Sequence, residues 1–291
     1  PLSTDAAAIA CDSSHSTLTA ASVTGATDDT SSGGDGVDTL NATLTGAGPT
    51  QSATSMTGVE ILNLTASPNP ATLNLTGVTG LTEVNNVSSA NGATLAGSNL
   101  GAPVNTTITG GNAATTNGYS PSVTAATATP DASTLTLAGT SAGSSFTATG
   151  IEAVTVKSTT SANVLSSLAV ASATSVVLEG DQDLTVLSGT VGGKALTTLD
   201  ASAATGAITL ATGNGTSVPT DVTGVTVTVP TSADAGIFTI TTGANVDAVT
   251  LGGGNAVVDT AGGADTITAT AGTNTITPGA GNSTITLGSG V

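Results

Sequence analysis

Apolar and polar residues alternate with a period of two along much of the chain. Clear runs lie at residues 73–76 (LNLT), 184–186 (LTV) and 225–229 (VTVTV). Because successive side chains of a strand point to opposite faces, such runs predict short strands with one buried face. Gly, Asn, Asp and Pro separate the runs, as turns between strands require. The pattern therefore predicts an all-β protein.

A nine-residue repeat organises the C-terminal part of the chain. From residue 242 it reads TGANVDAVT, LGGGNAVVD, TAGGADTIT, ATAGTNTIT and PGAGNSTIT. The eighth position of the repeat is always aliphatic: Val249, Val258, Ile267, Ile276 and Ile285. From the second unit on, the fourth position is always glycine: Gly254, Gly263, Gly272, Gly281 and Gly290. One such unit cannot bury its aliphatic side chain alone, so the units must stack. Glycine suits corners that need a positive φ, and the repeat predicts a parallel β-roll.

Related segments occur upstream of this array. Residues 33–41 read GGDGVDTLN, and the segments 57–64 (TGVEILNL) and 149–156 (TGIEAVTV) parallel each other. We predict an all-β fold, a parallel β-roll or β-solenoid, in which residues 42–230 form either further solenoid coils or β-sandwich modules. The expected division is an N-terminal segment 1–41, a Thr/Ala/Gly-rich β-repeat region 42–230 and a nonapeptide roll 231–291.

The charge balance narrows the choice of partners. The chain has 19 acidic residues against two lysines, Lys157 and Lys194, and a net charge of −17. Internal salt bridges cannot neutralise this excess, and such a surface disfavours nucleic acid and anionic membranes as partners. No apolar run approaches the ~18 residues of a transmembrane helix, so no membrane insertion is expected. Two interpretations remain: an acidic surface that is merely soluble, or a protein that binds many calcium ions.

Sites for catalysis are not indicated. The single histidine, His15, lies near the single cysteine, Cys11, in a polar N-terminal stretch. No G-x-S-x-G elbow with a histidine partner and no P-loop occurs, and the aromatic residues that sugar-binding sites use are limited to Tyr119, Phe146 and Phe238. We therefore expect that the chain is not an enzyme.

Three acidic groups are candidate calcium ligands. They are Asp28, Asp29, Asp35 and Asp38; Asp247 and Asp265; and Asp181 and Asp183. The carboxylates of the first group are spaced by glycines and would repel one another without a metal, while the glycine turns offer carbonyl oxygens as further ligands. Asp247 and Asp265 are two repeat units apart, so a roll with two units per coil would place them on the same side, one coil apart. A solvated acidic turn is the alternative for each group.

The nonapeptide 33–41 and the array 242–291 resemble the calcium-binding repeats of RTX (repeats-in-toxin) proteins. The chain is closest in style to Gram-negative S-layer proteins and RTX adhesins. This resemblance implies a roll ordered by calcium outside the cell, type I secretion, and a ligand Asp at the sixth position of the repeat. The sixth positions are Asp29, Asp38, Asp247 and Asp265, but also Ala256, Asn274 and Ser283. Several C-terminal turns are therefore expected to stack without metal.

Together these features predict a structural subunit of an extracellular assembly on a bacterial cell surface, an S-layer or a filament. Its expected cofactor is Ca²⁺, and its expected partners are other copies of itself, with cell-surface polysaccharide as a further candidate. A segment of a calcium-stabilised RTX adhesin is the first alternative. An ice-binding β-solenoid is the second, because outward T-x-T ranks such as Thr266 and Thr268 could order water.

Overall fold

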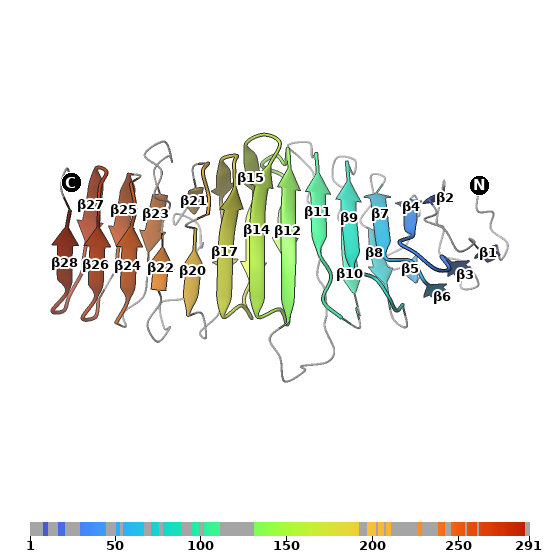
Figure 1. The fold of residues 1–291 in the computed structure, drawn as a ribbon, viewed down its shortest axis with the longest axis horizontal. Helices are drawn as coiled ribbons and strands as arrows, with labels where there is room; N and C mark the ends of the chain where they lie inside the picture. Colours follow the sequence, from blue (N-terminus) through green and yellow to red (C-terminus); the bar gives the residue numbers. More distant parts are fainter. Residues whose placement is uncertain are drawn as a thin grey trace. The chain divides into compact units, whose positions relative to one another are not determined.

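The computed structural model contains strands and turns, with no helix in its described part (Figure 1). The structure describes residues 8–10, 17–20, 30–44, 51–52, 55–66, 71–75, 78–88, 95–98, 100, 102–110, 131–191, 197–201, 203–206, 208–210, 226–228, 238–241, 246–253, 255–260 and 262–288. The chain forms two compact units. Unit 1 comprises Pro1–Thr136 and Thr140–Gly150, and unit 2 comprises Leu137–Gly139 and Ile151–Val291.

Unit 1 is built from parallel strands that stack coil upon coil. Its main sheet has the order β2 (Thr17–Ala20), β4 (Thr39–Leu44), β7 (Ile61–Ala66), β9 (Glu83–Val87), β11 (Thr106–Thr109). Two smaller sheets have the orders β1 (Ala8–Ala10), β3 (Thr30–Ser32), β6 (Ser55–Thr57) and β10 (Leu95–Ser98), β8 (Ala71–Asn74), β5 (Gln51–Ser52). Strand β13 (Ser145–Thr147) also belongs to unit 1, and the unit boundary falls within β12 (Ala132–Ala138).

Unit 2 follows the same plan. Its main sheet has the order β14 (Ala153–Thr159), β17 (Ser175–Gly180), β20 (Thr198–Asp200), β22 (Thr226–Thr228), β24 (Ala248–Leu251), β26 (Thr266–Ala269), β28 (Thr284–Leu287). A second sheet has the order β15 (Asn163–Leu165), β18 (Leu184–Val186), β21 (Ile208–Leu210), β23 (Phe238–Thr241), β25 (Ala256–Asp259), β27 (Asn274–Thr277). Strand β16 (Ser167–Val170) pairs with β19 (Gly189–Val191).

The register of the main sheets gives the length of each coil. In unit 1, Thr17 is paired with Thr39 and Thr39 with Ile61, so equivalent positions are separated by 22 in the sequence. At the C-terminal end, Ala248 is paired with Thr266 and Thr266 with Thr284, so the separation there is 18. The shorter separation equals two nonapeptides, and the predicted roll with two units per coil is confirmed.

The core lies between the sheets and follows the alternation seen in the sequence. In β14 and β17 every second side chain is buried, among them Val154, Val156 and Leu178. The same holds for the eighth position of the repeat in the inner coils, where Val249, Val258 and Ile267 are buried, while Ile276 is half-buried and Ile285 is exposed. Burial of small aliphatic side chains, at about 25 cal/mol per Å² of apolar surface, is thus the main stabilising term in a chain with so few aromatics.

The predicted glycine corners are also confirmed where the structure describes them. Gly263, Gly272 and Gly281 have φ of 122°, 86° and 141°, a region that residues with a Cβ rarely adopt. Gly254 and Gly290 lie outside the described residues.

The fold is a parallel β-solenoid, as predicted. All strand pairs given by the described part of 42–230 are parallel, so this region forms further coils, whereas a sandwich would need antiparallel sheets. The three-segment division 1–41, 42–230 and 231–291 stays a prediction. In the part of the chain that the structure describes, no helix has the length and apolar character needed to cross a bilayer.

Candidate metal centre at the corners of the coils

One residue at each coil stands immediately before a strand of the main sheet, and we call this set the corner column. Its members in unit 1 include Asp38, Glu60 and Thr82, and its members in unit 2 include Glu152, Thr174, Thr197, Asp247, Asp265 and Ser283. The backbone repeats here from coil to coil: the N–H of Ile61 donates to Asp38 O at 3.0 Å, and the N–H of Thr266 donates to Asp247 O at 2.8 Å. The solenoid therefore places equivalent backbone positions, with polar side chains, directly above one another in successive coils.

Where a member of the corner column is Thr, its hydroxyl donates a hydrogen bond to the preceding coil and brings no charge to the corner. Thr82 Oγ1 donates to Glu60 O at 3.1 Å, and Thr174 Oγ1 donates to Glu152 O at 3.2 Å. A neutral corner of this kind is satisfied by protein groups alone.

In unit 1 the corner column places the Glu60 carboxylate against the backbone of Asp38. Asp38 is buried, with 2% of its surface exposed. Its backbone N–H donates to Glu60 Oε2 at 2.8 Å, and Glu60 stands one coil further along the chain. Glu60 was not among the predicted ligands, because the separation of 22 that brings it beside Asp38 is the length of one coil, which the spacing within a motif does not give.

Close backbone packing surrounds Asp38. The N–H of Gly33 donates to Thr57 O at 2.9 Å. A Cβ added at Gly33 would lie 1.6 Å from Gly58 O and 2.7 Å from Asp38 Oδ2, so a carbonyl and a carboxylate oxygen converge beside this glycine. Only glycine permits this approach.

In unit 2 the corner column places Asp247, Asp265 and Ser283 at equivalent positions of successive coils. Asp247 and Asp265 are buried, with 2% and 1% of their surfaces exposed. The N–H of Asp247 donates to Asp265 Oδ1 at 3.0 Å, and the N–H of Asp265 donates to Ser283 Oγ at 3.3 Å. The predicted juxtaposition of Asp247 and Asp265, one coil apart on the same side, is thus present. Ser283 fills the sixth position of its repeat as an uncharged member of the same column.

The donor chemistry of both carboxylate pairs fits calcium. Ca²⁺ takes six to eight oxygen ligands from carboxylates, carbonyls and water. Asp38 with Glu60, and Asp247 with Asp265, each supply two carboxylates from neighbouring coils, and Gly58 O lies near the Asp38 carboxylate beside Gly33. Among the described residues no three Asp, Glu, His or Cys side chains gather in one place. A calcium ion at these corners would therefore rely on a carboxylate pair plus carbonyl and hydroxyl oxygens.

The other predicted ligands are placed differently. Asp35 is exposed at the tip of the glycine turn that leads to Asp38, and Asp181 and Asp183 are exposed on the turn between β17 and β18. The Asp183 carbonyl accepts hydrogen bonds from the Asn163 N–H at 2.8 Å and from Ser158 Oγ at 3.0 Å, so its backbone secures the turn. Asp28 and Asp29 lie outside the described residues. Calcium binding at these positions stays a prediction.

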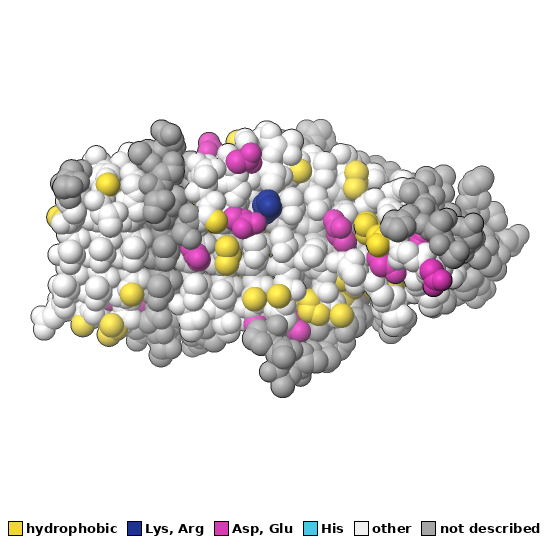
Figure 2. Space-filling model, viewed as in Figure 1, with side chains coloured by type: hydrophobic (Ala, Val, Ile, Leu, Met, Phe, Trp, Pro, Cys, Tyr) yellow, Lys and Arg dark blue, Asp and Glu magenta, His cyan; other side chains and the backbone are white. Residues whose placement is uncertain are grey.

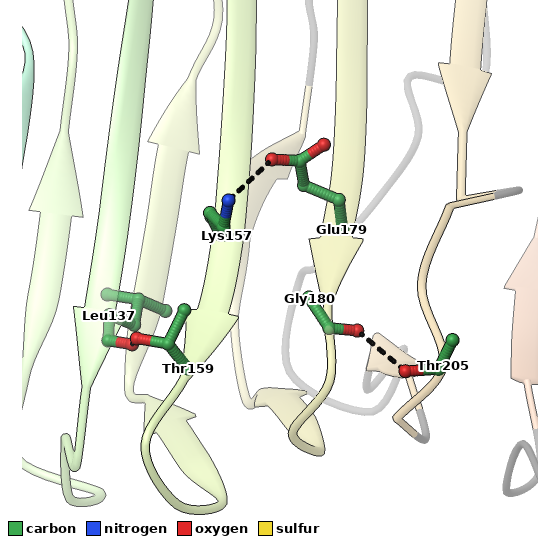
Figure 3. A network of polar contacts seen from close by, with 6 residues as sticks. All are labelled: Leu137, Lys157, Thr159, Glu179, Gly180 and Thr205. Carbon is green, nitrogen blue, oxygen red and sulfur yellow. Dashed lines mark hydrogen bonds and ion pairs between the residues drawn. The ribbon is translucent and has the colours of Figure 1, made fainter.

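Surface charge is arranged differently from the buried carboxylates. On the face shown in Figure 2, the acidic side chains of the described residues are spread among uncharged ones and form no single patch. In unit 2, Lys157 Nζ lies 3.6 Å from Glu179 Oε1 across β14 and β17 (Figure 3). Beside this pair, Thr159 Oγ1 donates to Leu137 O at 2.9 Å and Thr205 Oγ1 to Gly180 O at 3.4 Å. These outer contacts join neighbouring coils without any need for a metal.

Comparison of the chain with protein-family models, with curated proteins and with solved structures gives no match.

Proposed function

We propose that the chain is a structural subunit of an extracellular bacterial surface assembly, an S-layer or filament, that folds and assembles with calcium. The observation that carries this proposal is the corner column of a β-solenoid, in which Asp247 stacks on Asp265 and Asp38 on Glu60. The proposal also draws on the resemblance of residues 33–41 and 242–291 to RTX repeats.

The electrostatics of the column favour a divalent cation. Carboxylates held one coil apart at a corner that is largely shielded from water repel each other more than they would in solvent. The whole chain supplies two lysines against 19 acidic residues, so most carboxylates must find a cation outside the protein. Ca²⁺ is hard and divalent, prefers oxygen ligands, and is abundant outside cells, where RTX proteins work.

A structural role suits the coils. A solenoid is quasi-one-dimensional, and each coil contacts its neighbours only. Its strands carry polar side chains in rows: Asn85 Nδ2 donates to Asn63 Oδ1 at 2.9 Å, and Asn63 Nδ2 donates to Asn41 Oδ1 at 2.8 Å. Such a molecule serves as a building element, exported by type I secretion and retained at the cell surface by contacts with other copies.

Chelation tests this proposal. Purified chain in millimolar calcium is expected to assemble into sheets or filaments visible by negative-stain electron microscopy. Addition of excess EDTA should disperse the assembly and reduce the β signal of the circular dichroism spectrum, and renewed calcium should restore both. Magnesium at the same concentration is the control, since its smaller octahedral shell fits a carbonyl-rich corner poorly. Assemblies and spectrum that survive full chelation would contradict the calcium part.

The same experiment separates the adhesin alternative. A segment of a calcium-stabilised adhesin would show the calcium-dependent spectrum but would stay monomeric at every calcium concentration. It would bind a surface glycan instead, which a glycan array would detect.

An ice-binding function is a second candidate, and the register of the main sheet favours it. Two columns of outward side chains cross β24, β26 and β28. One contains Ala248, Thr266 and Thr284, and the other contains Thr250, Thr268 and Thr286. Strands about 4.8 Å apart make these columns a regular grid of hydroxyl and methyl groups. Thermal hysteresis of the purified chain, lost on substitution of Thr268 by Lys, is the expected result for this function. Its absence would leave Thr in its ordinary role as an outward strand residue.

A further inference from the structure

The outer face of the main sheet in unit 1 carries a hollow beside a row of asparagines. The hollow has a volume of about 260 Å³, and its described lining on strands β4, β7 and β9 consists of Asn41, Ala42, Thr43, Asn63, Thr65 and Val87. Ala42, Leu62 and Leu64 are buried, so the residues that alternate with them along β4 and β7 point outward. The hollow therefore opens on the solvent side of the sheet and not into the core.

Hydrogen bonds along the asparagine row all run in one direction. The Thr107 N–H donates to Asn85 Oδ1 at 2.8 Å. Asn85 Nδ2 then donates to Asn63 Oδ1 at 2.9 Å, and Asn63 Nδ2 donates to Asn41 Oδ1 at 2.8 Å. No described residue accepts a hydrogen bond from Asn41 Nδ2, which lies in the lining of the hollow. Because bonds in series polarise one another, the row ends in a strengthened amide donor that a ligand can use.

The two threonines of the lining add acceptors and apolar contact. Thr43 and Thr65 are partners in register on β4 and β7. Thr65 Oγ1 donates to Val87 O at 2.9 Å, so its oxygen keeps lone pairs that can accept a hydrogen bond from a ligand. The Thr43 hydroxyl can both donate and accept. The threonine methyl groups and the Val87 side chain supply apolar surface beside these polar groups.

The described lining of the hollow carries no charge, in a chain with 19 acidic residues and a net charge of −17. Glu83, the acidic residue of β9, does not belong to the lining, and its Oε1 accepts a hydrogen bond from Thr107 Oγ1 at 3.3 Å. A neutral lining offers a charged ligand no ion pair, and the net charge of the chain disfavours anions. The hollow therefore favours a ligand that is neutral and polar.

We propose that this hollow binds one neutral sugar ring of a glycan. Pockets for small molecules measure about 300–1,000 Å³, so a hollow of about 260 Å³ suits a single ring. The hydroxyl groups of a pyranose can accept from Asn41 Nδ2 and donate to the threonine oxygens. Its C–H groups can pack against Val87 and the threonine methyl groups.

The affinity of one hollow for one sugar is expected in the millimolar range, because no aromatic side chain belongs to the described lining. Many copies in one assembly would bind a repetitive glycan far more tightly through multivalency. The choice of a cell-surface glycan as the partner rests on the proposed function. The choice of a neutral sugar rests on the chemistry of the hollow.

Saturation-transfer-difference NMR tests the proposal, since it observes the ligand and tolerates an assembled protein. The probes are glucose, galactose, mannose and N-acetylglucosamine, each titrated against the full chain in millimolar calcium. At least one of them should bind with a millimolar dissociation constant. Glucuronate, which has the ring of glucose and an added carboxylate, should bind more weakly than glucose.

Two variants, each with a matched control, assign the binding to the hollow. Asn41→Asp keeps an acceptor for Asn63 Nδ2 but removes the terminal donor, and should weaken sugar binding at least about tenfold. Asn105→Asp is its control, because it adds the same charge and keeps the acceptor of the Thr134 N–H, at a position outside the lining. Thr43→Val removes a lining hydroxyl without changing the shape of the side chain, and should also weaken binding. Thr109→Val, on the same side of the sheet in β11, is its control.

Weaker binding in either lining variant, with unchanged binding in its control and an unchanged circular dichroism spectrum, supports the site. Binding of none of the four neutral sugars overturns the inference, as does tighter binding of glucuronate than of glucose. Unchanged binding in both lining variants, or equal losses in the variants and their controls, overturns it too. A chain that assembles in calcium but binds no sugar refutes this inference alone. A chain that binds sugar at the hollow but never assembles refutes only the proposed function.

Discussion

Two regions of unit 2 both stack parallel coils, but they differ in the number of strands per coil and in coil length. Between 153 and 191 each coil contributes three strands, as in β14, β15 and β16. Between 246 and 288 each coil contributes two, as in β24 and β25, and the sequence separation between coils falls to 18. We call these regions the three-strand coils and the two-strand coils. The third strand of each coil adds a third sheet, and with it more apolar surface that folding buries.

The cores differ accordingly. The three-strand coils bury Leu165, Leu168, Leu178 and Leu184 at 0% exposure, while the two-strand coils bury fewer large side chains, Leu251 and Ile267, beside smaller ones such as Val249, Val258 and Ala269. Since the transfer free energy scales with apolar area, each three-strand coil gains more from burial. The two-strand coils have less apolar burial to offset the entropy of ordering their chain.

The buried polar groups of the two regions differ in charge. In the three-strand coils Asn163 Nδ2 donates to Ser158 Oγ at 2.9 Å and to Ser161 O at 2.7 Å, so a neutral amide is satisfied by its own chain. In the two-strand coils the buried groups at the corner are the carboxylates Asp247 and Asp265. We therefore expect the three-strand coils to fold without a metal and the two-strand coils to need an external cation for stability.

The strongest test of this contrast lies in the core of the three-strand coils. Leu178→Ala removes a fully buried side chain from β17, and a cavity of this kind costs about 2–5 kcal/mol. Urea denaturation followed by circular dichroism should show this loss equally with calcium and with EDTA. A loss that calcium repairs would mean that the metal also stabilises the three-strand coils.

Much of the two-strand region was predictable because its repeat length is constant. A nonapeptide without insertions fixes the inward position of Val258 and Ile267 and the corner position of Gly263 and Gly281. The same regularity predicts that Asp247 stacks on Asp265, since two units make one coil.

The three-strand coils were predictable only as strands. Their coil lengths vary, because corner residues Glu152 and Thr174 are separated by 22 in the sequence, whereas Thr174 and Thr197 are separated by 23. Insertions at turns destroy a fixed period while leaving the alternation of buried and exposed residues intact. The sequence therefore predicts β structure in 42–230 but leaves solenoid and sandwich both open.

The candidate site was predicted in part for a similar reason. Asp35 and Asp38 lie close in sequence, yet Asp35 is exposed at the turn while Asp38 is buried at the corner. The true neighbour of Asp38 is Glu60, one coil away. Contacts between coils depend on coil length, which motif spacing within one turn does not reveal.

A middle-sized effect is expected on the two-strand side of the contrast. Asp265→Asn keeps an oxygen that can accept the Asp247 N–H but removes one of two stacked charges. Without calcium the variant should be more stable than wild type by about 1 kcal/mol, because the repulsion is relieved. With calcium at a hundred times the dissociation constant, wild type gains about 2.7 kcal/mol, and the variant should lose most of that gain. Thermal unfolding at several calcium concentrations measures both.

A matched control for this variant lies on an exposed turn. Asp181→Asn removes the same charge from the three-strand coils, where the side chain is in solvent. Its calcium response should match that of wild type. Equal loss of calcium response in Asp181→Asn and Asp265→Asn would show that diffuse surface charge, and not the corner column, binds the metal.

The weakest effect is expected for the ion pair between β14 and β17. Lys157 and Glu179 lie 3.6 Å apart, and their side chains are 47% and 32% exposed. Exposed pairs of this kind contribute about 0.2–1 kcal/mol and weaken with salt. Lys157→Met, which keeps most of the aliphatic stem, should therefore cost less than about 0.5 kcal/mol in physiological salt. A double-mutant cycle with Glu179→Gln isolates the pair. A coupling above about 1 kcal/mol that persists in concentrated salt would mean that charge, and not only apolar burial, holds the three-strand coils together, and the contrast with the two-strand coils would fail.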